Sequence, residues 1–127
     1  IPRNRLTVAE ADYTMHMMGG EVRERAVSAL VEHCRGTLAG LSMNASAVDW
    51  LVPHQANIRI IESTAKHLGL SMDKVVLTVD EHANTSAASI PLALDTGIRR
   101  GQIKRGQTLL LEGIGGGFAW GAVLLKY

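Results

Sequence analysis

Segments with helical periodicity alternate with short apolar runs from Glu21 to the end of the chain, and this alternation restricts the possible folds most strongly. Strands are expected in the four apolar runs, at 47–52, 75–79, 108–112 and 119–125. Parallel strands joined by helices form a sheet that is covered on both faces. We therefore expect an α/β fold, with a mixed and mostly parallel sheet between helix layers. The last two strands, joined by a glycine turn, should be antiparallel.

Local signals place the helices. The first is expected over residues 21–41, after a chain break at Gly19-Gly20, because apolar residues recur there at helical spacing. The apolar stripe of this helix consists of Val27, Leu30, Val31, Cys34, Leu38 and Leu41. The segment 6–18, which precedes the helix, fits a short strand or a connector. Asn57 can cap a helix over 58–68, which Gly69 ends in a left-handed conformation. The buried stripe of that helix is expected to be Ile58, Ile61, Ala65 and Leu68.

A third helix should begin at Thr85-Ser86, after a loop at 81–83, and Gly101 should end it. Pro91 must lie in its first turn or kink it. Its buried face is expected to hold Ile90, Ala93, Leu94, Gly97 and Ile98.

The composition argues against several classes of function. The chain has 127 residues, enough for one domain with a core. A net charge of +1 without a basic run argues against nucleic-acid binding. No apolar run reaches the roughly 18 residues that a membrane span needs, and no signal-peptide pattern follows the N-terminus. One cysteine cannot form an internal disulfide, so a reducing cytoplasm is the expected location.

Three polar strings follow the expected strands. They are His54-Gln55-Ala56-Asn57, Asn84-Thr85-Ser86-Ala87-Ala88-Ser89 and Gly115-Gly116-Gly117-Phe118. The carboxyl ends of parallel strands meet at one edge of a sheet, where ligands bind in α/β folds. An imidazole, a carboxamide and flexible backbone N–H groups at that edge can stabilise negative charge on a carbonyl oxygen. A single histidine at a strand end is more often structural, but the coincidence of three strings makes a functional site an equal alternative.

Each feature also has another reading. The glycine run suits a tight turn between strands, or an oxyanion donor, better than a phosphate loop, which would open a helix. Cys34 with His54 and Asn84 suggests a thiol-hydrolase triad, but its place in the apolar stripe favours core packing. Arg59 and Lys66 fit a solvated helix face or, less often, a docking patch for an acidic partner. The histidines lack the spacing typical of zinc ligands, so no metal is expected.

Longer strings around these residues closely resemble β-ketoacyl-[acyl-carrier-protein] synthase III, and the resemblance covers nearly the whole chain. The matching segments are Val52-Pro53-His54-Gln55-Ala56-Asn57, residues 82–89 from His82 to Ser89, and residues 115–121 from Gly115 to Gly121. The resemblance implies a thiolase fold of two similar α/β halves, with residues 1–127 as the C-terminal half. The nucleophilic cysteine of that family belongs to the N-terminal half, so the resemblance implies that this chain alone is inactive.

The resemblance also implies a reaction and roles for particular residues. The reaction is the decarboxylative Claisen condensation of malonyl-acyl-carrier-protein with an acyl primer, typically acetyl from acetyl-CoA, in fatty-acid biosynthesis. His54 and Asn84 would hold the enolate oxygen, and the Gly116 N–H would help to hold a second oxyanion. Ala56 and Asn57 match residues that line the pantetheine tunnel of the family. Gly19 and Gly20 match a pair of residues that contacts coenzyme A, although the family more often has asparagine at the position of Gly20.

Partners follow from the same resemblance. Arg59 and Lys66 match the basic helix that docks acyl carrier protein. The thioesters are substrates, so no cofactor is implied, and the parent enzyme would be a homodimer. Three alternatives remain open: a non-catalytic domain that binds carrier protein or a separate cysteine-bearing subunit, a related synthase of secondary metabolism, and a Cys34 thiol hydrolase.

Overall fold

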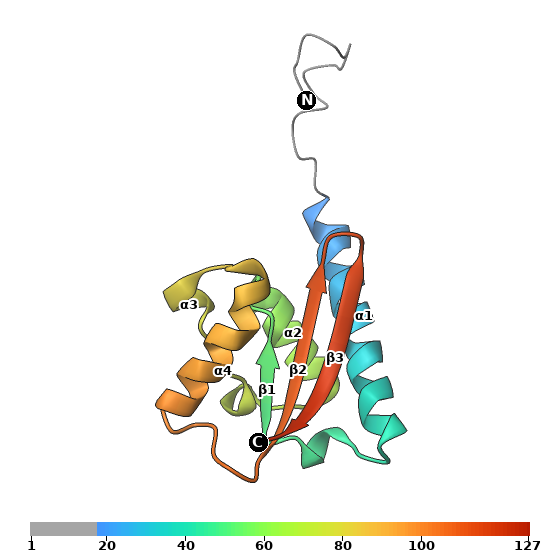
Figure 1. Ribbon diagram of the computed structural model, residues 1–127. Helices are drawn as coiled ribbons and strands as arrows, with labels where there is room; N and C mark the ends of the chain where they lie inside the picture. Colours follow the sequence, from blue (N-terminus) through green and yellow to red (C-terminus); the bar gives the residue numbers. More distant parts are fainter. Residues whose placement is uncertain (1–17) are drawn as a thin grey trace, which may run out of the picture.

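The computed structural model describes residues 18–127, so the strand or connector expected over 6–18 lies almost entirely outside the described part (Figure 1). The helices are α1 (Gly19–Gly40), α2 (Ile58–Leu68), α3 (Val79–His82) and α4 (Ser89–Arg99). The strands are β1 (Trp50–Pro53), β2 (Thr108–Gly115) and β3 (Ala119–Lys126). Single 3-10 turns occur at Ala45–Ala47, Met72–Lys74 and Ser86–Ala88. No helix in this part of the chain is long and apolar enough to cross a membrane.

The three strands form one mixed sheet in the order β1-β2-β3. β1 runs parallel to β2, with Leu51 opposite Leu110, and β3 runs antiparallel to β2, with Val123 opposite Leu111. The antiparallel pair that was expected on either side of the glycine turn is therefore confirmed. The turn lies at the same end of the sheet as the start of α1 (Figure 1).

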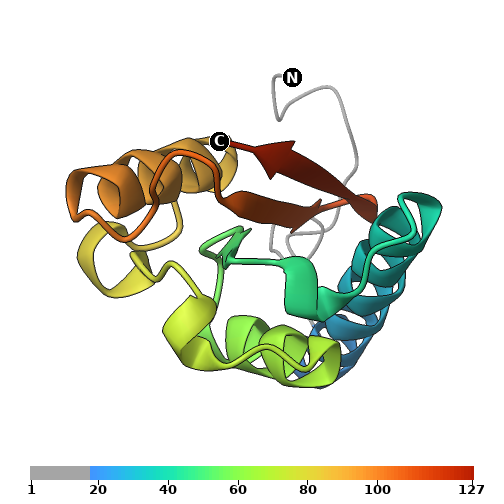
Figure 2. The ribbon, with the colours of Figure 1, turned by 90° about the horizontal axis from the view of Figure 1, so that it is seen from below.

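Helices cover both faces of the sheet, as expected for an α/β fold. Figure 2 shows α4 on one side and α1 with α2 on the other. Leu51 and Leu110 pack against α1 and α2, while Val52 and Leu109 pack in a second core that includes Ala93 of α4. Successive side chains of a strand point to opposite faces, so each strand contributes to both cores.

β3 is the least covered strand. Val123 of β3 is 60 % exposed. The residue opposite it in β2, Leu111, packs against the second core, which includes Ala93 of α4. The cover that α4 gives to β2 therefore does not extend over β3. Trp120 and Leu125 are also exposed, at 49 % and 37 %. Within residues 18–127 no strand pairs with the outer edge of β3, which leaves a row of unpaired backbone groups beside an apolar surface.

The strand expected over 75–79 is not formed. Val75 makes only an isolated parallel bridge to Leu51, and residues from Val79 onward form α3, which also replaces most of the expected loop at 81–83. The side chain of Gln55 explains the change, because its Oε1 accepts the backbone N–H groups of Thr78 and Val79 at 2.9 and 3.1 Å. Those N–H groups bond to a side chain instead of a neighbouring strand.

Sequence signals at the helix ends predicted some of the observed helix boundaries correctly and others wrongly. Asn57 accepts the N–H of Arg59 at the start of α2, and Gly69 ends it with φ +75°, both as predicted. The prediction of a chain break at Gly19-Gly20 is wrong, because both glycines lie in the first turn of α1. In that turn the Val22 N–H donates to the Met18 carbonyl. Leu41 and Ile58 are exposed, at 57 % and 37 %, because they lie at helix ends, beyond the opposing core.

The expected face of α4 packs on the sheet. Ala93 and Gly97 are buried, and Ile90, Leu94 and Ile98 pack against the second core. Pro91 lies in the first turn, as predicted, and Gly101 follows the helix with φ +70°. A side chain at Gly97 would lie 2.8 Å from Ile103 Cδ1, so glycine allows the close packing there.

Candidate active site

The three polar strings meet in one cleft at the carboxyl ends of β1 and β2. His54 follows β1, Asn84 precedes the turn at Ser86–Ala88, and Gly116 lies in the turn after β2; all three line a cleft of about 870 Å³. The convergence predicted from the strand order is thus present in the structure. The larger part of the apolar lining consists of Val22, Ala26, Ile60, Ile90, Ile114 and Phe118, and two further alanines, Ala56 and Ala87, complete it. The cleft therefore combines a few polar groups with an apolar wall, as small-molecule sites do.

His54 is fixed on both its backbone and its ring. Its N–H donates to the Glu112 carbonyl at 2.8 Å, which continues the β1–β2 ladder by one residue. Its Nδ1 lies 2.5 Å from Ser89 Oγ, at the start of α4. Burial lowers the pKa of His54, because desolvation disfavours the charged imidazolium. At neutral pH the ring is therefore a neutral group that can donate one hydrogen bond.

Gln55 holds the loop that carries this histidine. Its side chain is fully buried, and its Nε2 donates to the carbonyls of Pro53 and Val76 at 2.9 and 3.1 Å. Its Oε1 accepts the N–H groups of Thr78 and Val79. The carboxamide thus makes four hydrogen bonds and joins the end of β1 to the segment before α3. Nothing in the string His54-Gln55-Ala56-Asn57 indicated this role of Gln55.

Asn84 offers N–H donors to the cleft. Its Oδ1 accepts the backbone N–H of Ser86 at 2.9 Å. A backbone N–H can only donate, so the bonded atom is the oxygen, and the amide NH₂ is the group that remains. The chain around it turns sharply, since Ala83 and Ser86 both have positive φ, at 54° and 53°.

Gly116 brings the backbone of the β2–β3 turn to the cleft. Gly116 is exposed and lines the cleft together with Gly115 and Phe118. Gly117 has φ +142°, and a Cβ there would lie 3.1 Å from the Ala119 nitrogen, so this turn requires glycine at that position.

The structure separates the other predicted residues. Ala56 lines the cleft, but Asn57 is exposed and its Oδ1 caps α2. Gly19 and Gly20 lie one turn before the cleft-lining Val22 and are not themselves part of the lining. Arg59 and Lys66 are exposed residues of α2 that do not line the cleft.

Cys34 is a core residue. It is fully buried among the residues that pack α1 and α2 on the sheet, and it does not line the cleft. Desolvation, with a smaller contribution from Glu112, raises the pKa of its thiol to about 12. A buried thiol of that pKa is not a nucleophile at neutral pH, so the core interpretation of Cys34 is confirmed.

Glu112 is an unanticipated buried acid. It lies in β2 and is 2 % exposed, and its Oε2 has no hydrogen-bond partner. Burial raises the pKa of its carboxyl from 4.5 to about 8. No sequence signal indicated this, because the surrounding string Leu109-Leu110-Leu111-Glu112 reads equally well as a strand that ends at a solvated residue.

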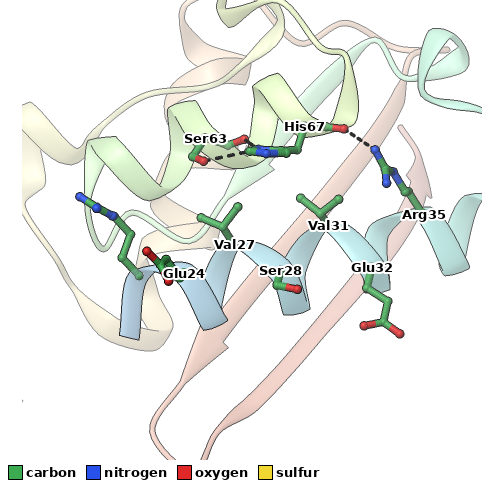
Figure 3. A pocket seen from close by; sticks show the side chains of 9 residues that line it. Glu24, Val27, Ser28, Val31, Glu32, Arg35, Ser63 and His67 are labelled. Carbon is green, nitrogen blue, oxygen red and sulfur yellow. Dashed lines mark hydrogen bonds between the residues drawn. The ribbon is translucent and has the colours of Figure 1, made fainter. Parts of the chain in front are cut away.

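A second, separate groove of about 530 Å³ runs between α1 and α2 (Figure 3). Figure 3 shows Val27 and Val31 pointing towards α2, with Glu24 and Glu32 on α1. Arg35 donates to the His67 carbonyl at 2.6 Å, and His67 Nδ1 donates to the Ser63 carbonyl at 2.7 Å. The Arg35 contact joins the two helices, whereas the contact between His67 and Ser63 lies within α2. Most of the residues that line this groove are polar or charged. Within residues 18–127, no three metal-ligating side chains lie together.

Comparison with known proteins agrees with this geometry. Residues 38–127 match the model of the family described as 3-oxoacyl-[acyl-carrier-protein (ACP)] synthase III C terminal. The β-ketoacyl-[acyl-carrier-protein] synthase III of Neisseria meningitidis is 70 % identical over 111 residues, which are 87 % of this chain and 35 % of the relative. The chain therefore spans about a third of the length of this curated relative.

Solved structures give the same result. The 3-oxoacyl-[acyl-carrier-protein] synthase III of Aquifex aeolicus superposes with a TM-score of 0.87 at 41 % identity, over 94 % of this chain and 39 % of the other. That of Pseudomonas aeruginosa superposes with a TM-score of 0.86 at 40 % identity, over 96 % and 38 %. The priming β-ketosynthase of the R1128 polyketide pathway has a TM-score of 0.78 at 34 % identity, over 87 % and 34 %. The fold is thus the thiolase-like α/β fold, and the chain belongs to the family of 3-oxoacyl-[acyl-carrier-protein] synthase III C-terminal domains.

Proposed function

We propose that this chain is the part of a β-ketoacyl-[acyl-carrier-protein] synthase III that stabilises the enolate during decarboxylative condensation. The observation that supports this most directly is the meeting of His54, Asn84 and Gly116 in one cleft. Two neutral donors from side chains and one from the backbone suit a reaction in which carbonyl oxygens gain negative charge. The buried Cys34 excludes the hydrolase alternative at this site.

The first step is loss of carbon dioxide from a malonyl thioester. The bond between the carboxylate carbon and the α-carbon breaks, and its electron pair moves into the thioester, where it forms an enolate. The His54 ring N–H and the Asn84 amide N–H donate to the enolate oxygen. A neutral donor pair favours this charged species over the ketone without requiring proton transfer.

The second step forms the new carbon–carbon bond. The enolate carbon attacks the carbonyl of an acyl group carried on a cysteine that this chain does not supply. The tetrahedral oxyanion would be held by the Gly116 N–H together with an N–H of the cysteine-bearing part. Collapse of this intermediate expels the cysteine thiolate and leaves the 3-ketoacyl thioester on the carrier protein.

The substrates and partners belong to the same proposal. The relatives are named for acyl carrier protein, and the exposed Arg59 and Lys66 on α2 would contact its acidic surface. The extra chain length of the relatives would supply the cysteine, complete a homodimer and cover β3. The acyl-CoA would enter past Ala56 and the start of α1, no resident cofactor is needed, and the enzyme would work in the cytoplasm.

The pathway proposed is fatty-acid biosynthesis. The identity to the Neisseria meningitidis enzyme is 70 %, against 34 % to the polyketide priming enzyme. The parts of the enzyme outside this chain would complete the pocket for the acyl primer.

A chimeric enzyme tests the proposal directly. This chain would replace the matching C-terminal segment of the Neisseria meningitidis relative, and mass spectrometry would detect acetoacetyl-carrier-protein formed from acetyl-CoA and malonyl-carrier-protein. We expect the chain alone to be inactive and the chimera to be active. His54→Ala should lower turnover by roughly 10²–10³-fold, whereas His33→Ala, at an exposed position of α1, should not. A folded chimera without product, or full activity in His54→Ala, would refute the proposal.

A further inference from the structure

The buried hydroxyl of Ser89 lies against the ring of His54. Ser89 is the first residue of α4 and is 1 % exposed, and its Oγ lies 2.5 Å from His54 Nδ1. The same Oγ lies 3.2 Å from the backbone nitrogen of Gln55. We propose that Ser89 is a positioning residue that holds His54 in the neutral tautomer with its proton on Nε2.

The proton positions follow from the donors and acceptors around Ser89 Oγ. The Gln55 N–H can only donate, so it occupies one of the two lone pairs of this oxygen. The hydroxyl hydrogen then needs an acceptor, and within the described residues the structure places only His54 Nδ1 in bonding contact with it. If Nδ1 carried the ring proton, the hydroxyl hydrogen would be buried without a partner, which is unfavourable. Nδ1 is therefore the acceptor.

This assignment determines what His54 presents to the cleft. With Nδ1 engaged by Ser89, Nε2–H is the ring group left to donate, in the same cleft that Asn84 lines with its amide NH₂ free to donate. The opposite tautomer would present a lone pair to an oxygen that gains negative charge. Ser89 thus acts through His54 and is not itself part of the cleft lining.

Contacts on two sides hold the Ser89 hydroxyl in place. Gln55, whose N–H anchors Ser89 Oγ, is itself fixed by the four hydrogen bonds of its buried carboxamide. Ser89 is fixed from the other side as the first residue of α4. The donor to His54 therefore comes from a rigid frame that links β1 to α4. The use of Nε2–H in catalysis rests on the proposed function, but the tautomer itself does not.

Nitrogen NMR of the full chain with labelled histidine measures the tautomer directly. The His54 ring signals would be identified by their loss in His54→Asn. Above the pKa of His54, we expect a protonated Nε2 and an unprotonated Nδ1. Ser89→Ala should lower the ratio of the two tautomers roughly 3- to 10-fold, the effect of one hydrogen bond. Ser89→Thr keeps a hydroxyl and should restore the ratio.

Ser86→Ala is the matched control, because Ser86 lines the cleft in the same segment but its side chain makes no contact with the ring nitrogen. It should leave the ring spectrum unchanged. A proton on Nδ1 in the unsubstituted chain would overturn the proposal even if Ser89→Ala did not fold, and so would an unchanged ratio in folded Ser89→Ala. In the chimeric enzyme, Ser89→Ala should lower kcat about tenfold with little change in KM. If the unsubstituted chimera is inactive, the proposed function fails while the tautomer result stands.

Discussion

Replacing Glu112 with glutamine should change how the stability of the protein depends on pH. The folded-state pKa of this carboxyl is about 8, against 4.5 when it is unburied. Between these values the folded state holds a proton that the unfolded state has released. The free energy of unfolding therefore falls as pH rises through this window, and the Glu112 contribution is fully present only below pH 4.5.

The size of the effect follows from the two pKa values. Each pKa unit corresponds to about 1.4 kcal/mol, so keeping Glu112 buried costs about 3 kcal/mol at pH 7 and about 5 kcal/mol above pH 8. Glu112→Gln removes this titration and keeps a similar shape. In this variant the glutamine amide also lacks a hydrogen-bond partner at the position of Oε2, which has none in the unsubstituted chain. The free-energy cost of that unpaired group does not vary with pH.

Urea unfolding of both proteins between pH 5 and pH 9 would measure the difference, with the m-value checked for constancy. We expect Glu112→Gln to gain stability relative to the unsubstituted chain by about 3 kcal/mol between pH 5 and pH 8. The titration of His54 cancels, because it is common to both proteins. Glu62→Gln, at an exposed position of α2, is the control and should give no such trend. Parallel pH profiles for Glu112→Gln and the unsubstituted chain would refute the reasoning.

Three further outcomes are expected. Gln55→Leu should lower the free energy of unfolding by about 2–5 kcal/mol, because four buried hydrogen-bonding groups lose their partner, and a loss under 1 kcal/mol in urea unfolding would contradict this. Cys34 should react with iodoacetamide only after denaturation, since it is fully buried with a pKa of about 12; rapid labelling of the folded chain, seen by mass spectrometry, would show the burial to be wrong. The isolated chain should self-associate through β3, and Val123→Lys should reduce the mass measured by light scattering. A monomer at high concentration before any substitution would count against that expectation.

Much of the fold was predictable because its signals are local. The cap at Asn57 and the left-handed Gly69 depend on neighbouring residues, and both are found as expected. The cleft was predictable for a related reason, since His54, Asn84 and Gly116 each lie where a strand or its connection ends. Parallel topology then brings such positions together.

The errors come from contacts between residues far apart in sequence. Residues 75–79 read as a strand, but Gln55, more than twenty positions earlier, takes the N–H groups of Thr78 and Val79. The role of Ser89 depends on how α4 meets the end of β1, which no periodicity in the sequence encodes. Likewise, the burial of Glu112 depends on the length of β2, which runs to Gly115 rather than ending at residue 112.

The mixed sheet also has a consequence for the order in which the molecule folds. The β2–β3 hairpin closes across a short glycine turn, whereas the contact between Asp49 and Thr108 at the start of the β1–β2 pair joins residues 59 positions apart. Closing the longer loop costs more chain entropy, so we infer that the hairpin forms first and the parallel pair later. Pulse-labelling hydrogen exchange during refolding should then protect the N–H of Leu125, which faces β2 as the N–H of Tyr127 does, before the N–H of His54, which donates to the Glu112 carbonyl. Simultaneous protection would argue against this order. The cleft, which needs both pairings, would be among the last features of the protein to form.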